Sequence, residues 1–330
     1  MSHSARRRQA HGQPWTPESE RTYTENIIRR AKAGSRPVLR EFAAWLERER
    51  GAALSTITVR IGSMRSFVEA TTPARGAWTG ERVQLTAQSL EDFFISYARK
   101  HGMAARRSMR SAVRGFLQFA ACRGWVEPDL KEAVPSLRTY RLSALPRGFD
   151  DDAVGQMLQV DDRVSTRDRA ILSLLACYGV RRGQVAALDL DDLGWRNRII
   201  RFAAHKGGKP VCHTLVPAVA EPLARYLHDE RPATQSRRVF LRSRAPYLPL
   251  SPKAISGLVM YRALKLGLVW PCGPHAFRHA FATRLLRSGQ PLKSIADLLG
   301  HRGLDAVGVY AKLNHPALLE VAVDWPEERP

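Results

Sequence analysis

The chain has 330 residues, of which 44% are hydrophobic, and its formal net charge is +21. This length allows two domains, because a single hydrophobic core usually stops growing before about 300 residues. Most of the positive charge is arginine, whose planar guanidinium binds phosphate through two parallel hydrogen bonds. These features favour a nucleic-acid partner over a basic surface that binds nothing in particular.

Two protein classes are disfavoured by the same sequence. No apolar run approaches the length of about 20 residues that crosses a bilayer, and residues 1–15 lack the apolar stretch of a secretory signal. We therefore expect a cytoplasmic protein without membrane segments. The cysteines form no Cys-x-x-Cys pair, so neither a disulfide framework nor a zinc site is indicated, and we expect buried free thiols. They are Cys122, Cys177, Cys212 and Cys272.

Residues 1–30 are polar and basic, without a sustained apolar period, and we expect a flexible arm. Amphipathic helices then predict a helical domain over residues 31–132. The first helix should have Ser35 as its N-cap, and the second should begin at Ser55. The apolar positions of these two helices follow the helical period. They are Val38, Leu39, Phe42, Trp45 and Leu46 in the first, and Ile57, Ile61, Met64, Phe67 and Val68 in the second.

The third predicted helix follows Thr86, and Gly102 lies where its C-terminal cap is expected. The fourth should run over residues 104–123 and carries three arginines spaced by four residues outside its apolar stripe. Like charges at this spacing repel one another, which favours DNA phosphate contact, with a solvated arginine face as the alternative. The candidate DNA-binding residues are therefore Arg106, Arg110 and Arg114.

A basic stretch interrupted by prolines predicts an interdomain linker over residues 133–148. Residues 149–315 then predict a mixed α+β domain, with strands at Ile199–Phe202 and Val211–Val216 joined by a turn that contains Lys206. The expected fold class is therefore mainly α with a small β-sheet.

Four short segments of the second half contain residue types suited to the attack of a phosphodiester. Each is a weak signal alone, because a single histidine or tyrosine is more often a packing residue. The segments are Tyr178–Gln184, the turn with Lys206, Pro274–His279 with its His-x-x-Arg-His run, and the Leu-Leu-Gly-His run at Leu298–His301, followed nine residues on by Tyr310. Together they closely resemble the tyrosine recombinase family, also called phage integrases, over residues 146–310.

The resemblance implies a helical core DNA-binding domain followed by a catalytic domain. In the catalytic domain Arg181 and Arg278 would hold the non-bridging oxygens of the scissile phosphate. Tyr310 would be the nucleophile. Its ordinary pKa of about 10 leaves the phenol protonated at neutral pH, and His275 would help to remove the proton.

Two further residues of the family's set match, Lys206 and His301. Lys206 would protonate the leaving 5′-oxygen, with Lys209 on the same turn as the competing assignment. His301 would donate a hydrogen bond to the phosphate. Two positions depart from the family: His205 replaces a glycine, and Gln184 replaces a glutamate. We expect the neutral Gln184 to orient the first arginine less firmly.

The resemblance implies a recombinase that acts as a tetramer on two sites in double-stranded DNA, without metal or cofactor. An integrase, a transposon recombinase and a Xer-like resolvase remain open, and so do a type IB topoisomerase and an inactive DNA-binding accessory protein. Residues 316–330 are too apolar for a solvated tail. They are expected to pack on their own domain or, as the family suggests, on a neighbouring protomer.

Overall fold

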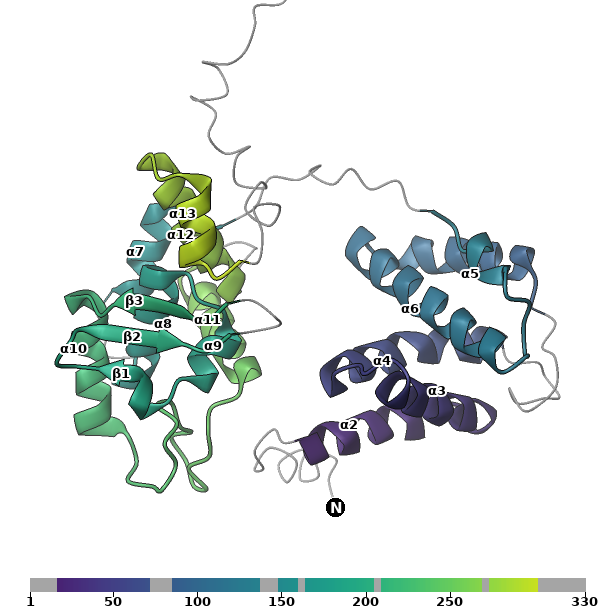
Figure 1. Cartoon of the computed structure of the whole chain (residues 1–330), viewed down its shortest axis with the longest axis horizontal. Coiled ribbons are helices and arrows are strands. Elements are labelled where there is room, and N and C mark those ends of the chain that lie inside the picture. Colours follow the sequence, from purple (N-terminus) through teal and green to yellow (C-terminus); the bar gives the residue numbers. More distant parts are fainter. Residues whose placement is uncertain are drawn as a thin grey trace, which may run out of the picture. The chain divides into compact units, whose positions relative to one another are not determined.

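The computed structural model describes residues 17–71, 85–136, 148–159, 164–204, 209–268 and 273–301. These residues form two compact units, 17–136 and 148–301, each around its own hydrophobic core (Figure 1). Within the described ranges no helix has the length and apolar character needed to cross a membrane.

The first unit is helical throughout its described part. Phe42, Phe67, Phe116 and Phe119 fill its centre, and the Phe42 and Phe116 rings meet edge to face with centroids 5.3 Å apart. All ten apolar positions expected in the first two helices are buried, which confirms that pattern. The helices are α2 (Pro17–Arg29), α3 (Arg36–Arg48), α4 (Leu54–Thr71), α5 (Ala87–Lys100) and α6 (Met103–Cys122), with 3-10 turns at Ala33–Ser35 and Leu130–Ala133.

Helix α2 corrects the expectation that residues 1–30 form a flexible arm, because residues 17–29 are helical. Ile28 is buried in the core, and the hydroxyls of Thr24 and Thr58 are hydrogen-bonded at 2.7 Å between α2 and α4. The apolar face of α2 was not predicted, because few of its residues are apolar and tertiary packing supplies most of a short helix's stability. Residues 1–16 lie outside the described residues.

Two of the predicted helix caps were correct and one was wrong. Thr86 caps α5, since its Oγ1 accepts a hydrogen bond from the backbone N–H of Ser89. Ser35 occupies the N-cap position of α3, as predicted, and its side chain makes no capping hydrogen bond. Gly102 has φ −72° and is the N-cap of α6, so it is not a left-handed C-terminal cap of α5. Helix α6 begins directly after α5, so Gly102 begins the second helix and does not end the first.

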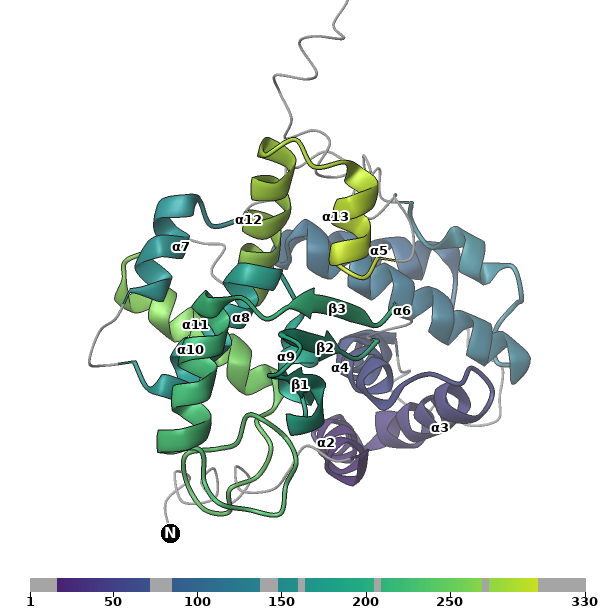
Figure 2. The ribbon, with the colours of Figure 1, turned by 60° about the vertical axis from the view of Figure 1, so that its left-hand side comes forward.

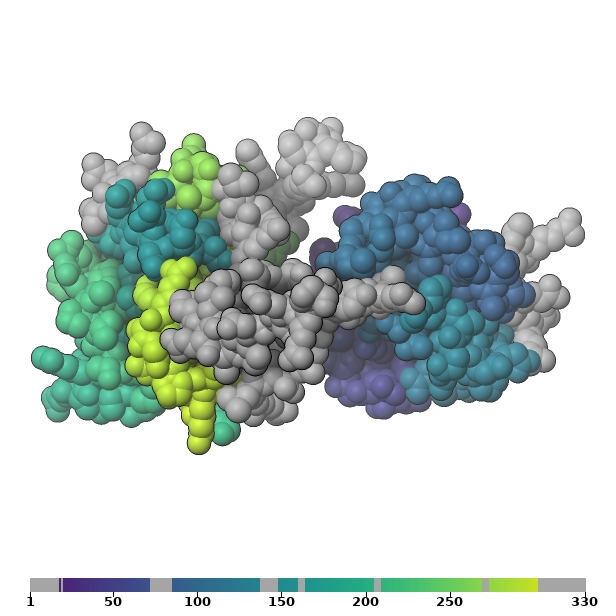
Figure 3. All heavy atoms as spheres, turned by 90° about the horizontal axis from the view of Figure 1, so that it is seen from above, coloured from purple at the N-terminus to yellow at the C-terminus, as the bar shows by residue number. Residues whose placement is uncertain are grey.

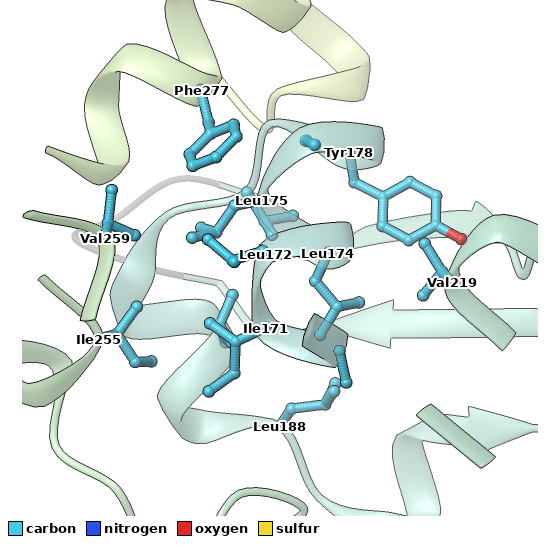
Figure 4. Packing of buried hydrophobic residues seen from close by; sticks show 14 of the residues in the cluster. Ile171, Leu172, Leu174, Leu175, Tyr178, Leu188, Val219, Ile255, Val259 and Phe277 are labelled. Carbon is cyan, nitrogen blue, oxygen red and sulfur yellow. The ribbon is translucent and has the colours of Figure 1, made fainter. Parts of the chain in front are cut away.

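The second unit combines helices with a small sheet, as expected. Helix α8 is its central element, and Ile171, Leu172, Leu174 and Leu175 are buried on several sides of that helix (Figure 4). The elements are α7 (Asp151–Leu158), α8 (Thr166–Tyr178), α9 (Arg182–Ala187), β1 (Leu193–Gly194), β2 (Ile199–Phe202), β3 (Val211–Thr214), α10 (Pro217–Arg225), α11 (Pro252–Lys265), α12 (Pro274–Arg287) and α13 (Leu292–Leu298).

The sheet is antiparallel in the order β1-β2-β3, and Ile200 pairs with His213. Strand β2 has the predicted bounds, while β3 ends at Thr214, two residues before the predicted end. Strand β1 was not predicted, because a two-residue strand cannot display the alternation by which strands are recognised. Helix α13 packs beside β3 (Figure 2).

The expectation of buried thiols is wrong for two cysteines. Cys122 is the last residue of α6 and is exposed, and Cys212 is exposed on the outward face of β3. Cys177 is half-buried, and burial raises the pKa of its thiol. Cys272 lies outside the described residues.

Candidate active site

Arg181 lies in the sharp turn between α8 and α9. Helix α8 ends at Gly179, whose φ of 59° is left-handed, and whose N–H donates to the carbonyl of Leu175 at 3.1 Å. A side chain at Gly179 would come within 2.7 Å of the Phe281 ring on α12. Glycine therefore serves both the backbone conformation and the close contact with α12. Arg181 follows in extended conformation as the N-cap of α9.

Helix α12 carries two of the predicted residues, His275 and Arg278, on neighbouring positions of one face. Arg278 is only 4% exposed. Its Nη1 donates to the carbonyl of Gly179 at 2.9 Å, and its Nη2 donates to the carbonyl of Leu299 at 2.8 Å. Both carbonyls stand at helix C-termini, where the partial charge is negative. One guanidinium thus joins the turn before Arg181 to the end of α13.

His301 is placed by the end of α13. Gly300 has φ 63°, its N–H donates to Asp297, and the N–H of His301 donates to Ala296 at 2.9 Å. These two bonds form a Schellman motif, which closes the C-terminus of a helix. A side chain at Gly300 would meet Val211 Cγ2 at 2.6 Å and the carbonyl of Lys209 at 3.1 Å. The motif therefore sets His301 beside the start of β3, and α13 lies at the surface of the unit (Figure 3).

The arginine charges act on the histidines of the candidate site. Burial, together with the positive charges of Arg278 and Arg181, lowers the pKa of His301 to about 4. Burial also lowers the pKa of His279, assisted by His275 and Arg278. At neutral pH His301 is a neutral imidazole, so it carries one N–H.

The Nε2 atom of His301 is buried and has no hydrogen-bond partner among the described residues. Such an atom costs folding free energy, and a ligand that fills the gap is one explanation for it. A phosphate between the two arginines and His301 would accept hydrogen bonds from all three. The same anion would raise the pKa of His301, because it offsets the arginine charges.

Four of the six predicted catalytic residues are therefore described. Electrostatic coupling links His301 to Arg278 and Arg181, and it links His279 to His275 and Arg278. The sequence motifs predicted that these four catalytic candidates belong to one site. They did not predict the carbonyl groups to which Arg278 donates. Lys206 and Tyr310 lie outside the described residues. So do His205 and the tail 316–330.

The three candidate DNA-binding arginines differ in their surroundings. Arg106 donates from Nε to the carbonyl of His101 at 2.7 Å and from Nη2 to that of Ala98, which closes the C-terminus of α5. Arg110 has a buried Nε without a partner in the described part of the chain. Arg114 lies in an open polar groove, 3.4 Å from Glu132.

This groove, which we call the basic groove, contains cations that the sequence reasoning missed. These cations lie just after the end of α3, on α4 and in the 3-10 turn after α6, and only the tertiary fold brings them together. Gly115 makes room for one of them, since a side chain there would meet Arg60 Nη1 at 3.3 Å. The charged residues that line the basic groove are Arg50, Arg60, Arg114, Lys131 and Glu132.

Gly300→Ala is expected to damage the site through backbone strain. Alanine at a left-handed φ costs about 1 kcal/mol, and overlap with the Lys209 carbonyl and Val211 adds about 1–3 kcal/mol. Thermal unfolding measures this loss. Gly289→Ala is the matched control, because Gly289 also has positive φ (76°) but open space around it, so it should lose only the strain. Equal losses in both variants would contradict the packing role of Gly300.

Comparison with known proteins agrees with this arrangement. The sequence pattern described as "Phage integrase family" matches residues 147–316 of the 330-residue chain. The chain belongs to the phage integrase family. This confirms the resemblance that the sequence motifs indicated.

Relatives of this integrase-family chain carry recombinase names. A Sinorhizobium fredii protein named as an integrase/recombinase is 36% identical over 250 residues, which are 74% of this chain and 61% of that protein. The chain thus spans less than two thirds of that relative's length. The tyrosine recombinase XerC of Shewanella amazonensis is 30% identical over 294 residues, 84% of this chain and 94% of XerC.

Solved structures share the fold. A lambda integrase dimer bound to a COC′ core site has a TM-score of 0.68 and 16% identity, and the match covers 89% of this chain and 99% of the other. A second lambda integrase structure, bound to DNA, has a TM-score of 0.62 and 17% identity, with 81% and 91% covered. The mainly helical fold with a three-stranded antiparallel sheet is therefore that of the lambda integrase.

Proposed function

We propose that the protein is a site-specific DNA recombinase that cuts and rejoins double-stranded DNA through a covalent bond between Tyr310 and a 3′-phosphate. The observation that supports the proposal is the position of Arg278, which joins the turn before Arg181 to the end of α13 beside His301, so that the two arginine charges act on His301. These residues lie in the part of the chain that matches the family.

The chemistry follows from the charge that develops on the phosphate. Attack by the Tyr310 oxygen forms a bond to phosphorus, and the bond from phosphorus to the 5′-oxygen breaks. Negative charge accumulates on the non-bridging oxygens in between, where Arg181 and Arg278 stabilise it. His301 adds a hydrogen bond from its neutral ring.

Two proton transfers balance this step. The phenol must lose its proton as it attacks, and His275 assists that loss. The departing 5′-oxygen must gain a proton, which Lys206 supplies, with Lys209 as the alternative donor. The phosphotyrosine bond keeps the energy of the broken bond, so a 5′-hydroxyl of another strand can reverse the reaction without ATP.

The general acid can be tested with a modified leaving group. Lys206→Ala is expected to slow cleavage of ordinary DNA by about 10²–10⁴-fold, and far less when the bridging 5′-oxygen is sulfur, because a thiolate leaves without protonation. Single-turnover cleavage of both substrates is the measurement. Lys209→Ala is the control. A selective defect in that variant instead would transfer the role to Lys209.

The basic groove is the proposed phosphate-binding surface of the helical unit. Its cations, Arg60 and Arg114 among them, come from separate helices and line one open depression. Arg106 is less suited to this role, since its guanidinium already binds two helix-terminal carbonyls.

The double variant Arg60→Gln and Arg114→Gln is expected to reduce the salt dependence of DNA binding. Each lost phosphate contact lowers the log–log slope of affinity against salt by about 0.9, so the pair should flatten it by about 2. Arg106→Gln is the control, expected to lower thermal stability and leave the slope unchanged. An unchanged slope in the double variant would remove the basic groove from the DNA interface.

We further propose that the protein acts as a tetramer on two DNA sites for a bacterial mobile element, and that residues 316–330 dock on a neighbouring protomer. Sequencing DNA that is trapped covalently on the protein in cells tests the proposed site-specific recombination. A recurrent site with recombinant junctions supports it. Relaxed circles without junctions would indicate a topoisomerase, and DNA binding without any covalent product would indicate an accessory protein.

A further inference from the structure

Gln184 lies one turn into α9, three residues after Arg181, and is 3% exposed. Its Oε1 accepts a hydrogen bond from the backbone N–H of Arg181 at 3.1 Å. Its Nε2 donates to the carbonyl of Ala203 at 3.1 Å, directly after the end of β2. The side chain therefore joins the turn that carries Arg181 to the strand of the sheet that leads toward Lys206.

The two partners determine which chemical group fits between them. A backbone N–H can only donate and a backbone carbonyl can only accept, so the position needs one acceptor and one donor. A neutral amide has both. An ionised carboxylate has acceptors alone, and it would place an oxygen against the carbonyl oxygen of Ala203 in a buried place.

We propose that Gln184 is a positioning residue that must be an amide, because it holds the main chain of Arg181 against the end of β2. The proposal rests on the function proposed above. Its effect on catalysis passes through Arg181, whose guanidinium must stay aligned with Arg278 and His301. The expectation that a neutral residue here weakens the orientation of Arg181 is therefore replaced by the opposite one: in this chain the glutamate usual in the family would be the weaker choice.

If an amide is required at this position, the stability and activity of Gln184→Glu should depend on pH in a way that a general packing defect would not produce. In Gln184→Glu the buried carboxyl regains a donor when it is protonated. Burial next to a carbonyl favours this protonated form and raises the carboxyl's pKa in the folded state. Gln184→Glu should therefore be close in stability to the parent protein at low pH, and it should lose stability as the pH rises through that pKa.

The experiment compares the parent protein with Gln184→Glu, Gln184→Met and Gln156→Glu at pH values from about 5 to 9. Gln156 is an exposed residue of α7 in the same unit, so its variant controls for the added charge. The readouts are the rate of covalent attachment to a cleavable DNA site and the thermal unfolding midpoint. Gln184→Met removes both hydrogen bonds at every pH and should be impaired by a similar factor throughout.

Gln184→Glu is expected to lose about tenfold or more in attachment rate at pH 8, and to approach the parent rate near pH 5. Its unfolding midpoint should fall below that of Gln156→Glu by about 5 °C at pH 8, with the gap closing at low pH. Full activity and stability of Gln184→Glu at pH 8 would overturn the proposal, and so would a loss that does not change with pH.

The thermal measurement also separates this inference from the proposed function. If the parent protein forms no covalent product at any pH, the recombinase proposal fails. The pH-dependent gap between the unfolding midpoints of Gln184→Glu and Gln156→Glu still decides whether an amide is required at this position.

Discussion

Tyr310→Phe is expected to abolish covalent attachment of DNA to the protein while leaving DNA affinity nearly unchanged. The substitution removes one oxygen, and no other part of the proposed reaction can form the bond to phosphorus in its place. The phosphate would still be held by Arg181, Arg278 and His301, so binding should persist. A denaturing gel detects the adduct, and a gel-shift titration measures affinity.

Tyr178→Phe is a matched control for the loss of a phenol oxygen. The Tyr178 hydroxyl donates to the carbonyl of Thr214 at 2.8 Å and accepts from the N–H of Val216 at 3.2 Å. Its removal should lower stability by about 1–3 kcal/mol, because two partly buried backbone groups lose their partner, and should leave the adduct intact in folded protein. A normal adduct in Tyr310→Phe would assign the nucleophile to another residue.

Arg278→Lys is expected to have the second large effect, a loss of about 10³-fold or more in the rate of covalent attachment. Lysine keeps the charge, but a single ammonium cannot reproduce the planar fork that reaches Gly179, Leu299 and a phosphate together. The two carbonyls would also be left buried without that donor. The free energy of unfolding should therefore fall by about 2–5 kcal/mol.

The control for this variant is Arg284→Lys on the same helix. Arg284 also donates to a carbonyl of α8, that of Ala176 at 3.0 Å, and its guanidinium lies over the Phe281 ring. It should lose stability without a specific loss of attachment rate. Single-turnover rates at a temperature where both variants are folded make the comparison. Equal rates in the two variants would reduce Arg278 to a structural residue.

Local patterns in the sequence determined much of this protein. Helical periodicity predicted the buried positions of α3 and α4, because one face of a helix packed on a core must be apolar along its whole length. The family could also be predicted, since its motifs are short and contiguous. Arg278 and His301 belong to such runs, and a run of fixed letters can be recognised without knowing what it contacts.

Only the tertiary structure decided which partners these residues meet. Arg106 and Arg114 look alike in sequence, eight positions apart on one helix, yet one closes the end of α5 and the other lines a groove with Arg60. In the sequence, Gln184 is a neutral residue at the position of the family's glutamate. Only the structure shows that the carbonyl of Ala203, nineteen positions away, accepts a hydrogen bond from the Gln184 amide. Hydrogen-bond polarity is set by the group on the other side of the contact, and periodicity along the chain carries no information about that group.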